Sequence, residues 1–244
     1  MRTAIISDIH ANLEALEAAL ADIASQGITD IVCLGDIVGY GPNPNECVEL
    51  VKKHCRLVLM GNHDAAALDV FSTQNFNINA KIAIEWTSNT LTHESKSFLT
   101  NLPMIHIDEA GTYVHATPYE PRMWYYITSL EEAGFNFQFF ETPFCFVGHT
   151  HIPVAISLVN GHSIEVSQDQ IIHYILDGTR RYLFNVGSIG QPRDRNRDSC
   201  YAILDAENSL FSLRRVAYDV ESCQKKMREV SLPDFLISRL SEGR

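Results

Sequence analysis

The first sixty residues alternate between a strand-like and a helical pattern. Three continuous apolar runs have the length of buried strands, at residues 3–7, 30–34 and 56–60. Between the first two, residues 12–25 place leucine and isoleucine at helical spacing. A second helix is expected to begin at Asn43, which can cap it, with Pro44 in the first turn and Glu46 returning a bond to the cap. This order predicts parallel strands joined by right-handed crossovers.

Two further helices are expected in the middle of the chain. Residues 75–92 place Ile78, Ile82 and Trp86 on one helical face. Ser129 and Glu132 have the spacing of a capping box and predict the start of another helix.

From about residue 144 the pattern changes to strands separated by Gly, Asn and Asp turns. The expected strands are 144–148, 154–159, 163–167, 170–176, 181–187, 200–205 and 210–216. A chain that begins with alternating strands and helices and ends in hairpins predicts an α/β (α+β) fold of two packed sheets with helices outside. The strand ends of the first sheet then point into a shared cleft.

Composition bounds the class of protein. The chain has 244 residues and 45% hydrophobic content, and no linker or repeat divides it, so we expect a single domain over residues 1–244. The formal net charge of −11 argues against a general binder of nucleic acid or of anionic membranes. The six cysteines form no CxxC pair, and no apolar stretch has the length of a signal peptide or a membrane span. We therefore expect reduced thiols and a cytoplasmic location.

Polar side chains cluster after five apolar runs. They are Asp8 and His10, then Asp36, then Asn62, His63 and Asp64, then His115, and finally His149 and His151. A single polar residue after a strand is usually a turn or a cap, but turn chemistry prefers Asn and Gly to His. Five such clusters at one edge of a sheet instead indicate a metal site.

These side chains suit two divalent transition-metal ions. Two carboxylates, one amide and four imidazoles provide mixed nitrogen and oxygen ligands, which favours Mn, Fe, Co, Ni or Zn over Ca or Mg. Residues i and i+2 of an extended segment point to the same side, so both members of the pairs Asp8/His10 and His149/His151 can reach one cluster.

The same blocks resemble the signature of calcineurin-like metallophosphoesterases. DIH at 8–10, GD at 35–36, GNHD at 61–64, His115 and GHTH at 148–151 occur in that family's order. The segments GDIVGYGPNPNECVEL and NVGSIGQPRD further resemble small bacterial and archaeal phosphoesterases of the YfcE-like branch, which include phosphodiesterases and dinucleoside polyphosphate hydrolases.

The resemblance implies a fold and a ligand set. The fold is a four-layer αββα sandwich of two mixed sheets flanked by helices. One metal ion would be held by Asp8, His10 and His151, the other by Asn62, His115 and His149, and Asp36 would bridge them. Among the metals that suit these ligands we favour Mn.

The resemblance also implies a mechanism. Two metal ions about 3.5 to 4 Å apart can share a hydroxide that attacks phosphorus in line. His63 is the family's candidate for giving the leaving oxygen its proton. Asp64 has two open alternatives, orienting His63 or capping the helix that follows.

One segment departs from the protein phosphatases of this superfamily. Their GDxVDRG motif places an Asp and an Arg where this chain has Gly39 and Tyr40. Phosphate then needs another cation, for which Arg193, beside the family-like GSIGQP, is the candidate, with a solvated role as its alternative. We expect Arg195 and Arg197 to be solvated and paired with Asp194 and Asp198.

Aromatic side chains crowd residues 113–146. They fit a core or a subunit interface of a homo-oligomer, but the loop 119–126 could also form a wall on which a nucleotide base stacks, with Tyr40 a second candidate.

These observations favour a metal-dependent phosphoric ester hydrolase, which cleaves phosphodiester or phosphoanhydride bonds of small, nucleotidic substrates. A phosphomonoesterase or protein phosphatase is an alternative that Gly39 and Tyr40 weaken. A non-catalytic scaffold, like the retromer subunit of this fold, would be expected to lack ligands that are complete here.

Overall fold

The computed structural model describes residues 2–167 and 173–244, which form two six-stranded sheets. The first sheet has the order β3-β2-β1-β11-β12-β9, and the second has the order β4-β5-β6-β10-β7-β8. The strands of the first sheet are β1 (Arg2–Ile6), β2 (Asp30–Cys33), β3 (Leu57–Val58), β9 (Tyr174–Ile175), β11 (Ser199–Asp205) and β12 (Leu210–Val216). Those of the second are β4 (Ile105–Ile107), β5 (Thr112–Val114), β6 (Phe144–Val147), β7 (Val154–Val159), β8 (Ser163–Ser167) and β10 (Arg181–Asn185).

Both sheets are mixed. In the first, β1, β2 and β3 are parallel, as the alternating pattern predicts, and β11 continues the sheet antiparallel to β1. In the second, β5, β6 and β10 are parallel, while β4 and β7 are antiparallel to their neighbours. The strand expected over 170–176 lies partly outside the described residues, and β9 is its described end.

The helices are α1 (Leu13–Ser25), α2 (Pro44–His54), α3 (Asn62–Ala67), α4 (Ile78–Thr90), α5 (His93–Thr100), α6 (Leu130–Asn136), α7 (Val220–Glu229) and α8 (Asp234–Glu242), with a 3-10 turn at Pro121–Met123. The side chain of Asn12 caps α1, and Ser129 and Glu132 form the expected capping box of α6.

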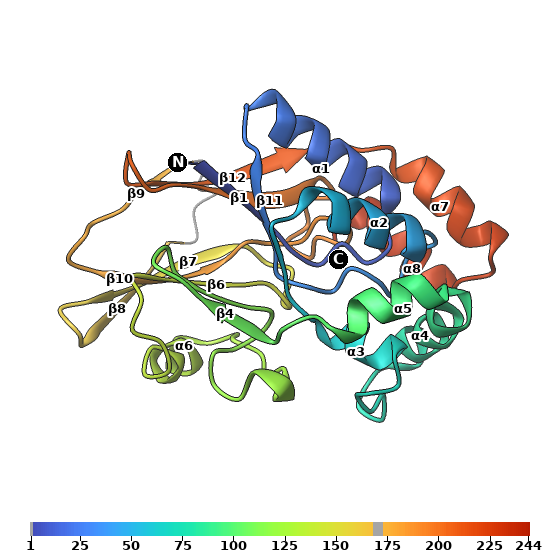
Figure 1. Cartoon of the computed structure of the whole chain (residues 1–244), viewed down its shortest axis with the longest axis horizontal. Coiled ribbons are helices and arrows are strands. Elements are labelled where there is room, and N and C mark those ends of the chain that lie inside the picture. The colour runs from blue at the N-terminus through green and yellow to red at the C-terminus, as the bar shows by residue number, and fades with distance from the viewer. Residues whose placement is uncertain (1, 168–172) are drawn as a thin grey trace.

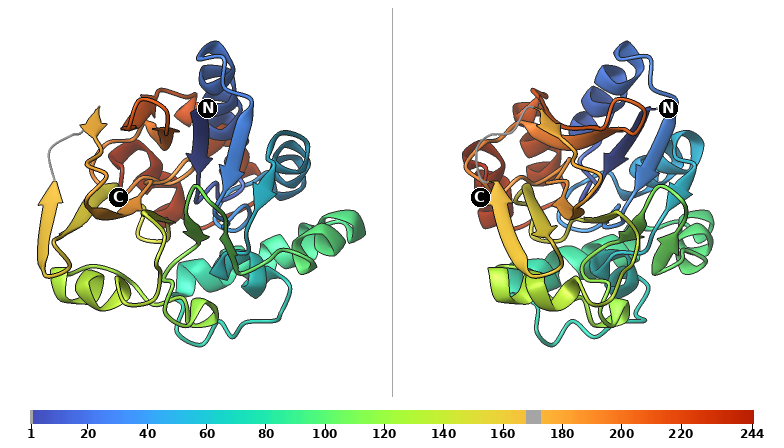
Figure 2. Two further views of the ribbon diagram at one scale, coloured as in Figure 1. Left: turned by 60° about the vertical axis from the view of Figure 1, so that its left-hand side comes forward. Right: turned by 90° about the vertical axis from the view of Figure 1, so that its left-hand side faces the viewer.

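Three apolar layers hold the molecule together. One packs α1 and α2 on the outer face of the first sheet through residues such as Leu16 and Val48. A second lies between the sheets, where Phe184 and Phe211 stack at 3.8 Å between ring centroids. A third packs α6 on the second sheet. Figures 1 and 2 show the resulting order of helices, sheet, sheet and helix, which confirms the expected four-layer sandwich.

The helices expected from Asn43 and over 75–92 are confirmed as α2 and α4, with two differences in detail. Asn43 is the N-terminal cap residue of α2 and its side-chain amide donates to Glu46 Oε1 at 3.1 Å, but the Asn43 side chain makes no hydrogen bond to the helix backbone. Ile78 and Ile82 face outward, with 67% and 43% of their surface exposed. Helix α4 instead buries Ala80, Ala83 and Ile84, of which the two alanines let the helix approach its neighbours closely.

All six cysteines are free thiols, as expected. Among the described residues, no helix combines the length and the apolar character needed to cross a bilayer.

Candidate metal centre

The polar residues that follow the strands meet where the two sheets end. Asp8 and His10 follow β1, Asp36 follows β2, and His149 and His151 follow β6. His115 follows β5, and Asn62 and His63 begin α3. All seven predicted ligands have exposed fractions of 6% or less. Sequence segments as far apart as residues 8 and 151 thus form one buried cluster.

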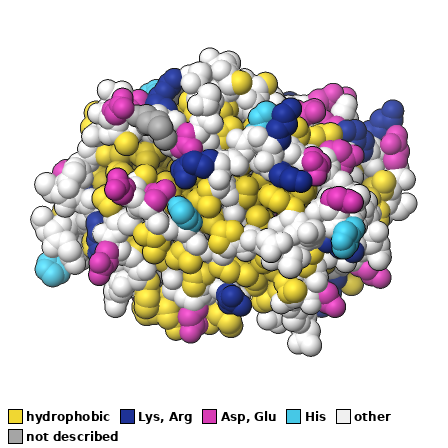
Figure 3. Space-filling model, in the orientation of Figure 1, with side chains coloured by type: hydrophobic (Ala, Val, Ile, Leu, Met, Phe, Trp, Pro, Cys, Tyr) yellow, Lys and Arg dark blue, Asp and Glu magenta, His cyan; other side chains and the backbone are white. Residues whose placement is uncertain are grey.

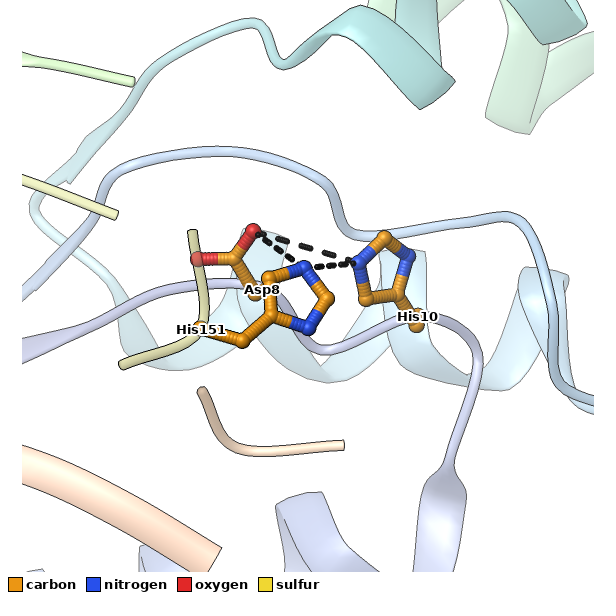
Figure 4. Close-up of side chains that lie close together, drawn as sticks. All are labelled: Asp8, His10 and His151. Atoms are coloured by element: carbon orange, nitrogen blue, oxygen red, sulfur yellow. Dashed lines mark hydrogen bonds and ion pairs between the residues drawn. The ribbon is translucent and has the colours of Figure 1, made fainter. Parts of the chain in front are cut away.

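The first group contains Asp8, His10 and His151, which Figure 4 shows converging. His10 Nε2 lies 3.1 Å from His151 Nε2, and His151 Nε2 lies 3.2 Å from Asp8 Oδ1. The backbone amide of His149 donates to the Asp8 carboxylate, at 3.0 Å to Oδ2. That bond fixes the carboxylate toward the two imidazoles.

The second group contains Asp36, His115 and His149. His115 Nε2 lies 3.3 Å from Asp36 Oδ2 and 3.2 Å from Asn62 Oδ1, so the Asn62 amide joins this group. His149 Nε2 is buried and has no hydrogen-bond partner in the part of the chain that the structure describes. An unpartnered buried nitrogen is costly unless something else binds it.

Asp36 lies between the two groups. Its Oδ2 atom is 3.7 Å from His10 Nε2 and 3.3 Å from His115 Nε2. Its other oxygen accepts the backbone amide of His63 at 2.8 Å. Asp36 also belongs to a third group with His10 and His63. The carboxylate is therefore placed to contact two cations at once.

Backbone carbonyls orient three of the imidazoles. The Nδ1 atoms of His10, His115 and His151 lie 3.3, 3.2 and 2.6 Å from carbonyl oxygens, those of Val38, Leu34 and Gln191 respectively. A carbonyl oxygen only accepts, so each Nδ1 carries a proton, and the neutral imidazoles of His10 and His151 turn the lone pair of Nε2 toward the centre. Two facing lone pairs, as in His10 and His151, are unfavourable without a cation between them. The residues therefore fit the divalent metal ions that their chemistry predicts.

The protonation states favour metal binding. Burial opposes the charge of Asp8 and Asp36, but the imidazoles of His151 and His115 outweigh it, and both carboxyls have a pKa below the usual range. Burial lowers the pKa of His10 and His151, and burial with the nearby His115 lowers the pKa of His149 to about 3. Ionised carboxylates and neutral imidazoles are the forms that ligate metals.

His115 differs from the other imidazoles. Burial lowers its pKa, but Asp36 and Asp8 outweigh burial and raise the pKa to about 9. In the absence of a cation, His115 thus carries a proton beside two carboxylates.

The backbone is strained at the ligands. Asp8, His10, Asp36, His149 and His151 all have positive φ, between 51° and 65°. Non-glycine residues seldom adopt this left-handed conformation, and where they do so together the strain usually serves a site. Gly61 adds a close approach, since a β-carbon there would overlap the Asp36 carboxylate.

His63 lies beside the groups, and among the described residues no carboxylate is hydrogen-bonded to its ring. Its ring lies 4.9 Å from that of His10, and its Nδ1 is buried without a partner. Burial and the nearby Arg193 guanidinium lower its pKa to about 4. Gly39, with φ of 87°, lies so close to the ring that a β-carbon added there would be 2.6 Å from Nδ1.

Asp64 could orient His63 or cap α3, and the structure shows that it caps the helix. Its Oδ2 accepts the amide of Gly61 at 3.0 Å, and its Oδ1 accepts the amides of Ile37 and Val38. The carboxylate makes no hydrogen bond to His63 among the described residues. It ties α3 to the loop that carries Asp36 and so positions that ligand.

Tyr40 and Arg193 lie next to the ligands. The Tyr40 ring is 4.7 Å from the His10 ring and 4.3 Å from the His63 ring. The Arg193 guanidinium lies 5.9 Å from the Tyr40 ring, and its Nη2 donates to Gln191 Oε1 at 2.8 Å. Arg193 Nε is buried without a partner. The structure thus brings both predicted substrate contacts to the cluster.

The tyrosines of the loop 119–126 have two different surroundings. Tyr126 stacks on His149, with 4.1 Å between ring centroids, and is half-exposed. Tyr119 packs instead with Phe135 and Phe139 over α6, and hydrophobic side chains gather there on the face in Figure 3. Sequence patterns alone did not separate Tyr126 from its neighbours.

The arginines after Arg193 lie away from the cluster. Arg195 and Arg197 are exposed, as expected. One predicted partner of these side chains, Asp194, pairs instead with Arg215 of β12, whose Nη1 also donates to the carbonyl oxygen of Asp198.

Arg239 of α8 was missed by sequence reasoning. Burial and then the charge of the Arg193 guanidinium lower the pKa of Arg239 to about 10, while Tyr40 raises it. No motif marks it, because only the docking of α8 brings it to the site.

The chain is similar to known proteins over most or all of its length. The family model of the calcineurin-like phosphoesterase superfamily domain matches residues 1–209. The protein MJ0912 of Methanocaldococcus jannaschii is 41% identical over 247 residues, which covers 99% of this chain and 98% of that protein.

Solved structures are similar as well. The crystal structure of a metallophosphoesterase from Sphaerobacter thermophilus matches with a TM-score of 0.86 and 41% identity, over 100% of this chain and 99% of that chain. A hypothetical protein from Pyrococcus horikoshii, with 21% identity and a TM-score of 0.76, shares the fold over 100% of this chain and 98% of its own.

Proposed function

This chain belongs to the calcineurin-like phosphoesterase superfamily, and we propose that it hydrolyses phosphodiester or phosphoanhydride bonds of small nucleotidic substrates at a binuclear metal centre. The observation that carries the proposal is the position of Asp36 between two ligand groups, with its Oδ2 3.7 Å from His10 and 3.3 Å from His115.

The chain offers a ligand set for each ion. Asp8, His10 and His151 would hold one, and Asn62, His115 and His149 would hold the other, with Asp36 shared. Mn is the favoured metal, since mixed imidazole and carboxylate ligands suit it. When bound, such ions polarise phosphoryl oxygens and lower the pKa of water for in-line attack.

His63 would supply the proton for the leaving oxygen. In the hydrolysis, water forms a new bond to phosphorus, the bond from phosphorus to the leaving oxygen breaks, and that oxygen needs a proton. His63 lies beside the cluster and its Nδ1 has no hydrogen-bond partner among the described residues. The negative charge of a bound phosphate favours the protonated imidazole.

Other side chains would bind the substrate. Arg193 Nε is buried, unpartnered and close to the ligands, and a guanidinium is well suited to phosphate oxygens. Tyr40 and Tyr126 contact the ligand histidines through their rings and present aromatic faces against which a base could stack.

Turnover of two substrates, with an aryl phosphomonoester measured beside them, tests the proposal. Mn-loaded protein should cleave a dinucleoside tetraphosphate and an aryl phosphodiester, and chelator-treated protein should cleave neither. Faster cleavage of the nucleotide would support a dinucleoside polyphosphate hydrolase. Activity only on a phosphomonoester would favour the monoesterase alternative, and metal binding without any turnover would favour a scaffold; either result would overturn the proposal.

A further inference from the structure

The imidazole of His63 is held among three other rings. The Phe76 ring lies 5.0 Å from it, centroid to centroid, at an interplanar angle of 42°. The Tyr40 ring lies 4.3 Å away at 47°, and the His10 ring lies 4.9 Å away at 83°. Only 5% of His63 is exposed, and its Nδ1 has no hydrogen-bond partner among the described residues. Ring contacts, rather than a hydrogen bond to Nδ1, therefore orient this side chain.

Of these three rings, that of Phe76 has no other part in the candidate metal centre. His10 is a predicted metal ligand, and Tyr40 is a candidate substrate contact. Phe76 lies outside the ligand groups, in the segment that joins α3 to α4, and its side chain has no polar atom. Any effect of Phe76 on the chemistry must therefore act through the side chain that its ring contacts, which is His63.

The backbone at Phe76 is fixed by the start of α4. Phe76 directly precedes Asn77, whose side chain caps the helix by accepting the amide of Ala80 at 3.0 Å. The amide of Phe76 donates to the carbonyl oxygen of Thr73 at 2.9 Å. Helix α4 in turn packs against α3, which carries His63 (Figure 1). The Phe76 ring and the His63 ring thus come from two elements whose relative position is set.

Apolar contacts hold the Phe76 ring itself. The half-buried side chain packs against the apolar cluster that contains Ala66 and Ala67 of α3 and against the one that contains Ala80 of α4. Its ring also lies 6.2 Å from that of Phe71, which packs on Trp124 at 4.5 Å. A ring with so many neighbours leaves little freedom for the imidazole beside it.

We propose that Phe76 is a positioning residue, which fixes the orientation of the His63 imidazole for proton transfer to the leaving oxygen. The inference rests on the proposed function, in which His63 supplies that proton. Proton transfer requires the donor nitrogen within hydrogen-bond reach of the leaving oxygen, so a freely rotating imidazole would slow the reaction without weakening substrate binding. Tilted aromatic contacts favour one arrangement of two rings and so restrict this rotation.

Kinetics of single and double variants test the inference, with Mn-loaded protein and an unsubstituted diphenyl phosphodiester, whose leaving oxygen needs a proton. Phe76→Leu should lower kcat about tenfold through the lost ring contact, with KM and bound Mn unchanged. Phe76→Tyr keeps the ring and should retain kcat within about twofold. In the His63→Asn background, Phe76→Leu should cause no further loss, because the group that it positions is absent.

Two comparisons control for a general effect of losing the ring. Phe98→Leu removes another half-buried phenyl ring, on α5, and should leave kcat unchanged. A diester whose nitrophenol leaves as a stable anion needs no proton, so Phe76→Leu should cleave it at the wild-type rate. Phe76→Met, which also lacks the ring, supplies the same measurements if Phe76→Leu does not fold.

The outcomes separate this inference from the function beneath it. Three results, in variants that keep the wild-type unfolding temperature, would each overturn the positioning role. They are an undiminished kcat in Phe76→Leu, a loss that recurs in full in the His63→Asn background or with the nitrophenyl diester, and a rise in KM alone, which would make Phe76 a substrate contact. Wild-type protein without turnover, or full turnover in His63→Asn, would instead overturn the proposed function of His63, and the inference with it.

Discussion

A β-carbon at Gly39 would lie 2.6 Å from Nδ1 of His63, closer than real contacts allow. The bare glycine therefore leaves His63 Nδ1 buried and unpartnered. Protein phosphatases of the superfamily fill this position with a supporting Asp. Here the space next to the imidazole has no such partner, which separates this site from theirs.

Gly39→Ala should lower kcat/KM for the aryl phosphodiester at least tenfold. The methyl group would displace the His63 ring, and a φ of 87° is strained for alanine, which should cost about 1 kcal/mol of stability or more. Steady-state kinetics and urea unfolding measure both effects. Gly178→Ala, with open space around it, is the matched control. Full activity in Gly39→Ala would show that the position of His63 is unimportant.

His63→Asn should reduce kcat by about 10² to 10⁴, the range typical of a lost general acid, while bound metal stays constant. Metal content by atomic emission and turnover are measured on the same sample. His63 also lies in a ligand group with His10 and Asp36, so a loss of one metal ion per chain would make it a ligand instead. His93→Asn, an exposed histidine of α5, should change neither quantity.

Tyr126→Leu should raise KM for a dinucleoside tetraphosphate about fivefold or more, since stacking on a base contributes about 1 to 3 kcal/mol. Tyr126 stacks on His149, whereas its neighbour Tyr125 stacks on Tyr119, with 6.0 Å between the ring centroids. Tyr125→Leu therefore serves as the control. Equal KM values in both variants would remove Tyr126 from the substrate site.

Asp22 should contribute to the stability of the fold in a pH-dependent way, and it is not one of the residues of the metal centre. Its carboxylate accepts from Arg214 Nη2 at 2.8 Å and from the Tyr201 hydroxyl at 2.7 Å, and these bonds outweigh burial and lower its pKa. A carboxyl with a lowered folded pKa stabilises the fold above its unfolded pKa, and this stabilisation is lost as pH falls through the folded pKa.

Asp22→Asn should therefore lower the free energy of unfolding at pH 7 by about 1 kcal/mol, the typical worth of such a partly exposed bond. The difference from wild type should shrink as the pH falls below the ordinary Asp range, as urea unfolding at several pH values would measure. Glu85→Gln, an exposed change on α4, should show no such trend. A difference independent of pH would contradict the assignment.

Much of the site could be predicted from the sequence, because the order of the strands determines which ligands lie close together. Asp8 and Asp36 follow the parallel strands β1 and β2, whose carboxyl ends lie together, so the sequence pattern predicts that they are neighbours. His149 follows β6 of the second sheet and joins them because the two sheets pack against each other. The family resemblance adds the pairing into two groups. Neither the positive φ of these residues nor the carbonyl partners of the imidazoles can be read from a pattern, because both depend on loops that close only in the fold.

Tertiary contacts explain what the sequence did not predict. Tyr40 acts electrostatically on Arg239 only because the end of α8 docks on the loop after β10, where the amide of Arg195 donates to Gly243. The sequence could not distinguish two roles for Asp64, orienting His63 or capping α3. In the fold, its Oδ1 accepts the backbone amides of Ile37 and Val38, which turns the carboxylate away from the role of orienting His63. Ile78 and Ile82 follow a helical period yet face outward, since α4 packs through its alanines.

The central claim is a pair of metal ions that share Asp36, and counting bound metal tests it most directly. Chelator-stripped protein would be reconstituted with Mn, and the bound ions would be counted by native mass spectrometry alongside diester turnover. The account predicts two Mn ions per chain in the wild type, fewer in Asp36→Asn, and turnover that rises with metal content. One ion per chain at full turnover, or an unchanged count in Asp36→Asn, would contradict it.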